Sequence, residues 1–307
     1  MGHDVSVHQP LGNGALETLL PVLALSAAAG AYLLLAHRAR RRNPVLGWSP
    51  WRTASFLTGT VLLGAALLPP VASLAHDDFR AHMIQHLLIG MYSPLALVLA
   101  APVTLLLRTL PAPRARRLTG MLRSTPARFV ARPVVALTLS VGSLVPLYFT
   151  PLYNAIAGVP AAHWLLHAHF FLSGCLFTHA IAGPDPAPSR PGVRARLVCL
   201  GVAVAMHAVV SQLMYGGFRV HIHAPVDQVR GGAEIMYYGG DGAELLLAAA
   251  WVTTWRPDRR RTAPPRVAET GARRQGAEAD SSAPVSPGPS RPRMVASPTH
   301  DWSSPLP

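Results

Sequence analysis

Seven long apolar runs constrain this chain more than any other feature of its sequence. A helix that crosses a membrane needs about 20 mostly apolar residues. Only 13% of the residues are charged, against about a quarter in soluble domains. The sequence therefore predicts an all-α, polytopic membrane protein with seven transmembrane helices. The predicted helices are Leu16–Ala36, Ala54–Ala75, Met83–Leu107, Val134–Phe149, Ala162–Ala182, Leu197–Gly216 and Ala233–Trp255.

The arginines predict the orientation. All 27 basic residues are arginines, and with the N-terminus outside all but Arg80, Arg219 and Arg230 fall on the cytoplasmic side. Cytoplasmic loops carry this excess in membrane proteins. We expect a short extracytoplasmic N-terminus (1–15), a transmembrane domain (16–255) in the cell (cytoplasmic) membrane, and a cytoplasmic C-terminus. Because loop placement explains the net charge of +13, we expect no nucleic-acid partner.

The ends of the chain and its cysteines carry weaker signals. Residues 256–307 are rich in Pro, Ser and Arg, which predicts a disordered cytoplasmic tail. The first apolar run has no basic segment before it, so we expect it to remain as an anchor rather than a cleaved signal peptide. Cys175 and Cys199 form no CxxC pattern, which indicates neither a disulfide framework nor a thiolate metal site.

Histidines are the chemically distinctive residues of the apolar runs. His82 and His86 are four residues apart in AHMIQHLL, as are His163 and His167 in AHWLLHAHF. Residues at i and i+4 share one helix face and can converge on one ion. His169 lies about 200° around the helix from His167, so we expect it to face elsewhere. The other deep histidine is His207.

Polar residues recur on the last two predicted helices. Ser211 and Met214 share a face with His207, and Glu244 lies one turn deeper than Asp241. Ionisable residues at such depth are costly and usually face the interior of a helix bundle, paired or lining a path. The supporting residues predicted for the site are His169, Met206, Met214, Asp227, Gln228, Glu234 and Asp241.

Copper is the metal that these residue types suit best. Imidazole with optional thioether and without thiolate favours copper over zinc and iron. Other interpretations stay open: His82 and His163 also fit solvation at a membrane interface, Asp241 fits a structural hydrogen bond, and the methionines fit apolar packing. The predicted metal ligands are His82, His86, His163, His167 and His207.

Four stretches together resemble a known family. They are HMIQHLLIG with the following SPL and AAPVTLLLR, HWLLHAHFFLSGCLF with PDPAP, MHAVVSQL, and the later DQ and EIMYY. From about Phe56 to Trp255 the chain resembles the CtaG-type cytochrome c oxidase assembly factors, whereas the first helix and the tail carry no part of the resemblance. The resemblance implies a role in maturing haem-copper oxidases at the copper delivery step. It marks His82, His86, His163, His167, His169, His207, Asp227 and Gln228.

The expected function is therefore a non-enzymatic assembly factor that delivers or inserts copper from the outer side of the membrane. Haem-copper oxidase subunits, other copper chaperones and the lipid bilayer are the expected partners, and copper is bound transiently. Two alternatives remain: a haem-binding protein that pairs His86 or His167 with His207, and a copper or proton transporter that uses Asp241, Glu244 and His207. The sequence shows no nucleophile–base pairing, phosphate-binding glycine loop or zincin motif.

Overall fold

The computed structural model describes residues 11–187 and 192–254, with side chains from residue 18 to residue 253. All regular secondary structure in these residues is helical, which confirms the predicted all-α class. The predicted tail 256–307 lies outside the described residues, as does the predicted N-terminal segment up to residue 10. Helix α1 begins at Leu11, five residues before the predicted start.

The helices of the first half are α1 (Leu11–Arg42), α2 (Pro50–Leu67), α3 (Val71–Asp77), α4 (Phe79–Leu87), the π-helical turn η1 (Leu88–Tyr92), α5 (Ser93–Leu99), α6 (Pro102–Thr109), α7 (Ala112–Leu122) and α8 (Thr125–Val130). The second half contains α9 (Pro133–Leu137), the π-helical turn η2 (Thr138–Gly142), α10 (Leu144–Phe149), α11 (Leu152–Ala157), α12 (Pro160–Ala182), α13 (Val193–Tyr215) and α14 (Val226–Thr254). Several of these helices begin with proline. The first residues of a helix have no intrahelical partner for their N–H groups, so the N–H that proline lacks is not needed there.

Four helical stretches of the described chain are long and apolar enough to cross a membrane: Thr18–Arg42, Phe79–Thr109, Pro160–Ala182 and Val193–Tyr215. A fifth is added if α2 and α3, which are bent by 41° relative to each other, form one span. Pro133–Phe149 is apolar but shorter, and α14 is long but carries carboxylates that lower its hydropathy. The chain is thus a multi-pass membrane protein, and seven spans with the N-terminus outside stay a prediction.

Breaks in the long helices coincide with prolines. Pro69 and Pro70 separate α2 from α3. Pro94 follows η1 at the start of α5, and because proline has no N–H it removes one bond from the α-helical ladder. Ala101 has a left-handed backbone (φ 54°) before Pro102 opens α6. The predicted spans 54–75, 83–107 and 134–149 are therefore broken into shorter helices, whereas α1, α12, α13 and α14 are each continuous.

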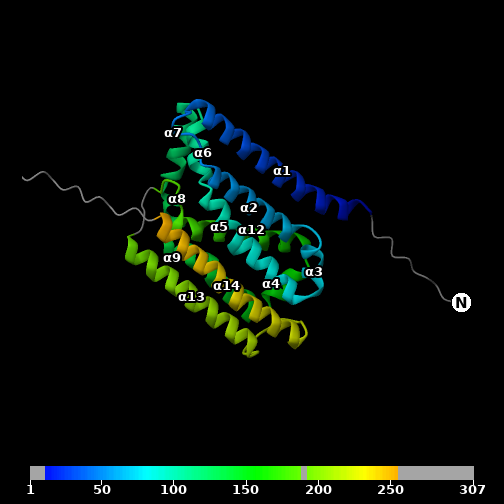
Figure 1. Ribbon diagram of the computed structural model, residues 1–307. Coiled ribbons are helices and arrows are strands. Elements are labelled where there is room, and N and C mark those ends of the chain that lie inside the picture. Colours follow the sequence, from blue (N-terminus) through cyan, green and yellow to red (C-terminus); the bar gives the residue numbers. More distant parts are fainter. Residues whose placement is uncertain (1–10, 188–191, 255–307) are drawn as a thin grey trace, which may run out of the picture. The chain divides into compact units, whose positions relative to one another are not determined.

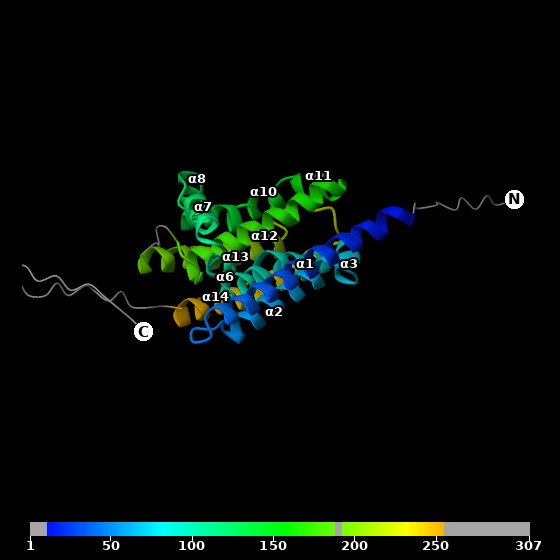
Figure 2. The ribbon, with the colours of Figure 1, turned by 90° about the horizontal axis from the view of Figure 1, so that it is seen from above.

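The helices pack around one main core. α14 packs along α13 and α4 (Figure 1), and α12 packs on α5, η1 and α9. α1 lies beside α2, as Figure 2 shows, and contacts α6. The two π-helical turns also meet this core, since both η1 and η2 contact α12. Its largest fully buried side chains include Tyr148, Met83 and Ile89.

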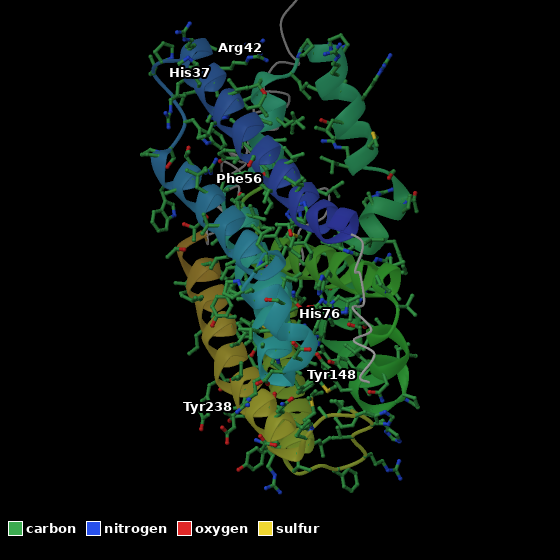
Figure 3. The ribbon with its side chains drawn as sticks, turned by 90° about the vertical axis from the view of Figure 1, so that its right-hand side faces the viewer. His37, Arg42, Phe56, His76, Tyr148 and Tyr238 are labelled. Atoms are coloured by element: carbon green, nitrogen blue, oxygen red, sulfur yellow. The ribbon has the colours of Figure 1, made fainter. Side chains whose placement is uncertain are left out.

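Arginines gather at the end of the bundle away from the histidines. His37 and Arg42 lie at one end in Figure 3, whereas His76 and Tyr148 lie in the other half. At the arginine end, the indole of Trp48 donates a hydrogen bond to the Tyr32 hydroxyl, with 3.1 Å between nitrogen and oxygen. Which end of the bundle lies on the cytoplasmic side stays a prediction from the arginine distribution.

Candidate metal centre

Helix α4 places two histidines in the interior. Asp78 caps the helix, because its carboxylate accepts a hydrogen bond from the Arg80 backbone N–H at 2.8 Å. The Gln228 side-chain oxygen accepts a bond from the Phe79 N–H at 3.2 Å and so ties α4 to α14. His82 and His86 are 2% and 6% exposed. The spacing of four residues therefore does put both imidazoles on the buried face.

Histidines of three helices form a cluster near one end of the bundle. The rings of His163 and His167 on α12 lie 4.4 Å apart, measured between centroids. His163 is also 5.3 Å from His76 of α3 and 6.4 Å from His82 of α4. We call His76, His82, His163 and His167 the histidine cluster. Local helix spacing supplies two members, and the bend between α3 and α4 brings in His76.

The ring separations in the histidine cluster approach those of a shared ion. With metal–nitrogen bonds of about 2.0–2.1 Å, two imidazoles on one ion have centroids about 5–6 Å apart. The nitrogens of His82 and His167 are buried without a hydrogen-bond partner. As the side chains stand, no group of three or more His, Cys, Asp or Glu residues within 11–187 and 192–254 is arranged as a metal site. Ring rotations would be needed to bring three nitrogens together.

A cavity of about 410 Å³ adjoins the histidine cluster. His76, His163 and His167 line it, together with Gln85 of α4. The Gln85 amide donates a hydrogen bond to the Ala66 carbonyl oxygen at 2.8 Å, while its own oxygen has no partner. The cavity is therefore lined by three imidazoles and one amide, and the His167 nitrogens and the Gln85 oxygen are buried in its wall.

Aromatic rings close the inner side of the cluster. Tyr153 lies 5.0 Å from His82 and 5.6 Å from Phe79, edge-on to each. Burial raises the pKa of Tyr153 to about 12, so its phenol stays protonated at neutral pH. The Tyr148 hydroxyl donates to the Met83 sulfur at 3.9 Å. These rings exclude water from one side of His82.

His207 belongs to a different place. Its Nδ1 lies 3.5 Å from Oε1 of Glu244 on α14, and both side chains are 3% exposed as residues. We call these two residues the inner pair. His86 packs against Phe170, with 4.3 Å between the two ring centroids. Among the described residues, its ring makes no stacking contact with either member of the inner pair. The five predicted ligands are thus divided between the cluster, the inner pair and His86.

The supporting residues are scattered. His169 is half-buried and its ring lies 5.8 Å from Phe170, so it faces away from the cluster as predicted. Glu234 and Tyr238 are exposed, which shows that the stripe they form with Asp241 points outward, not into the bundle. Met214 is buried, Met206 and Asp241 are half-buried, Asp227 is exposed, and Gln228 is half-buried.

Sequence reasoning missed four residues of this region as site members: His76, Gln85, Tyr153 and Glu244. Gln85 lies between the two predicted histidines of α4, and its position three residues after His82 was the available signal. The depth of Glu244 in the membrane was apparent from the sequence, but Asp241 was the residue predicted to support the metal site. Nothing local marks His76 and Tyr153, because the first contacts His163 of α12 and the second contacts His82 of α4, both far away in the sequence.

Comparison with known proteins identifies related chains. Residues 30–258 match the family described as cytochrome c oxidase caa3 assembly factor (Caa3_CtaG). The match starts inside α1, so the expectation that the first helix carries no part of the resemblance was wrong. No solved structure matches this chain significantly.

The curated relatives are longer mycobacterial proteins. The uncharacterized proteins Mb0105 of Mycobacterium bovis and MT0111 of Mycobacterium tuberculosis are each 33% identical over 260 residues, covering 78% of this chain and 38% of the relative. The uncharacterized protein ML1998 of Mycobacterium leprae is 36% identical over 169 residues, covering 52% of this chain and 26% of its own length. This chain therefore spans less than half of each relative.

Proposed function

Because this chain belongs to the cytochrome c oxidase caa3 assembly factor family, we propose that it delivers or inserts copper during assembly of a haem-copper oxidase. The observation that carries the proposal is the histidine cluster beside the 410 Å³ cavity. Membership of an assembly-factor family implies a non-catalytic role. The partners are then oxidase subunits in the membrane, with other copper chaperones upstream.

The chemistry of the cluster suits a cargo that must bind and leave. Imidazole is a good copper ligand, and it is neutral when it binds, so burying it costs less than burying a thiolate. The exposed His76 and the half-buried His163 line the cavity, so an ion reaches the cluster without unfolding a helix. Ring rotation supplies two or three nitrogens and also releases the ion. The copper would be held at the end of the bundle opposite Arg42. The arginine distribution assigns that end to the outer side of the membrane.

The haem alternative fits the geometry less well. A bis-histidine haem needs His207 and either His86 or His167 on opposite faces of the haem, each with one ring nitrogen directed at the iron. His207 instead lies against Glu244 and close to Gly240, where an added Cβ would be 2.8 Å from its ring. His86 is covered by Phe170. The transporter alternative rests on the same inner residues and predicts copper or proton flux in proteoliposomes.

The test is the copper content of the purified chain. The double variant His82→Asn, His167→Asn removes two members of the histidine cluster, and we expect it to lose the copper that the wild-type protein binds. His169→Asn is the matched control, because it changes a histidine on the same helix, two residues from His167 and outside the cluster. Equal copper in the double variant and the control would refute the assignment.

The cellular readout separates binding from function. In a strain that carries the double variant at limiting copper, the terminal oxidase should be present but copper-deficient. The strain with His169→Asn should contain a fully metallated oxidase. A fully metallated oxidase in a strain lacking the chain altogether would show that the copper role is wrong, whatever the protein binds.

A further inference from the structure

An open groove lies beside α2 in the half of the bundle that carries the arginines. Its volume is about 650 Å³, and residues of α2, α5 and α14 line it. Leu62, Leu99 and Leu246 make its walls apolar, and the side chain of Ala249 on α14 is small. Leu246 and Ala249 are exposed, so the groove opens toward the lipid around a multi-pass membrane protein. An apolar chain can therefore lie against the bundle at this place.

The length of the groove matches one leaflet of a bilayer. Along α2 its lining extends from Arg52 to Leu62, which are ten residues apart. At about 1.5 Å per residue this is about 15 Å along the helix axis. The hydrocarbon core of a bilayer is about 30 Å thick. The groove therefore begins at a charged residue and ends about one leaflet deeper.

Three guanidinium groups gather around the Trp48 ring at the charged end of the groove. Arg52 lines the groove and lies over this ring, with 5.0 Å from Cζ to the centroid, and Arg108 lies over it at 5.5 Å. The Arg40 Nε donates a hydrogen bond to the Trp48 carbonyl oxygen at 3.3 Å. Among the residues that the structure describes, no carboxylate forms an ion pair with Arg52. The carboxylate of Asp185 instead accepts two backbone N–H groups at the start of α6. This end of the groove is therefore positively charged.

The same end of the groove has residues typical of a membrane interface. Trp51 lines it and is 76% exposed, and tryptophan is enriched at the level of the lipid headgroups. Ser49 precedes α2 and also lines the groove, and its side chain makes no capping hydrogen bond. The first N–H groups and the positive end of the α2 dipole at this point favour an anion. Positive charge and hydrogen-bond donors thus lie where the apolar part of the groove begins.

We propose that the groove binds one anionic phospholipid, with its phosphate at Arg52 and one acyl chain between α2, α5 and α14. Arginine can bind a phosphate through two N–H groups at once, and basic pockets between transmembrane helices bind anionic headgroups. A groove one leaflet deep fits an acyl chain better than the transmembrane helix of a partner, which crosses both leaflets. The site lies away from the histidine cluster and does not depend on the proposed function.

The experiment compares the binding of phosphatidylglycerol and phosphatidylcholine to the full-length chain in detergent by native mass spectrometry. We expect the wild type to bind phosphatidylglycerol about fivefold more tightly, the factor that one arginine near an anionic headgroup contributes, and Arg52→Gln to lose this preference. Arg116→Gln is the matched control, because it removes an exposed arginine of α7 outside the groove. Equal preference in the two variants, or none in the wild type, would overturn the headgroup site.

A second pair of variants tests the apolar part of the groove without changing a charge. Ala249→Phe places a ring in the groove at an exposed position, and it should weaken the binding of both lipids. Val252→Phe is the matched control, because Val252 is exposed on the same helix and does not line the groove. Equal lipid binding by these two variants would show that no acyl chain occupies the groove.

Photo-crosslinking in native membranes identifies the occupant directly. Thr58 is exposed and lines the groove, so a photo-reactive amino acid at this position should form an adduct whose added mass is that of a phospholipid. The adduct should be depleted in the chain that also carries Ala249→Phe. A crosslink to another polypeptide, or to a second copy of this chain, would overturn the proposal.

Discussion

The contact between α12 and η1 predicts a sharp difference between two glycine-to-alanine substitutions. A Cβ on Gly174 would collide with the carbonyl oxygen of Gly90, which is backbone and cannot rotate away. Overpacking of this kind costs about 1–3 kcal/mol, and a backbone obstacle favours the upper end. Alanine gains about 1 kcal/mol over glycine in a helix interior. Gly174→Ala should therefore be destabilised by about 2 kcal/mol.

The matched control is Gly201→Ala on α13, where an added Cβ meets nothing within 4 Å. This variant keeps the propensity gain of about 1 kcal/mol without the collision, so the two variants should differ by about 3 kcal/mol. At about 2–4 °C per kcal/mol, their thermal midpoints in detergent should be about 6–12 °C apart. If Gly174→Ala melts at or above Gly201→Ala, the close packing of α12 on η1 is not what holds these helices together.

Three further predictions concern single side chains. Asp185→Ala should lower the stability by about 0.5–2 kcal/mol, measured by thermal melting, because its carboxylate accepts two backbone N–H groups at the start of α6. Gly240→Ala should displace the His207 ring, from which a Cβ would lie 2.8 Å, and lower the stability by about 1–3 kcal/mol, measured by thermal melting; an unchanged midpoint would show that the ring is free to move. The hydrogen bond from the Arg80 guanidinium lowers the pKa of the Asp78 carboxyl. The ionised Asp78 therefore stabilises the fold fully above its unfolded pKa of about 3.9. This stabilisation disappears as the pH falls through the lower pKa of the folded state. The melting difference between wild type and Asp78→Asn should close over that range, and a constant gap would contradict the assignment.

The sequence predicted the parts of the fold that depend on local periodicity. Apolar runs located the helical segments to within a few residues at most ends, because helix length and hydropathy are properties of neighbouring residues. The spacing of four residues placed His82 with His86 and His163 with His167, and the 200° offset separated His169 from them. Each of these is a consequence of 3.6 residues per turn.

Long-range contacts decided the rest. The sequence named five candidate histidine ligands without showing whether they converge, because which helix faces which is set by packing, and α14 packs against both α13 and α4. That arrangement pairs His207 with Glu244 and leaves the cluster to α3, α4 and α12. The burial of Glu244 beside a half-buried Asp241 has the same cause. Depth along a helix can be counted from the sequence, whereas the direction of a side chain depends on the neighbours of the helix.

One helical stretch connects the histidine cluster with the surroundings of the inner pair. α4 carries His82 into the cluster, continues through His86, and passes into η1, whose Gly90 lines a cavity beside Glu244. A π-helical turn contains one residue more than the α-helical turn it replaces, and one residue rotates an α-helix by about 100°. The face that α4 presents to α12 is therefore offset from the face that α5 presents, and η1 sets that offset. A continuous α-helix through residues 79–99 could not orient His82 toward the cluster and also keep Gly90 against Gly174. The π-helical turn is thus what allows one transmembrane stretch to contact both the histidine cluster and the surroundings of Glu244.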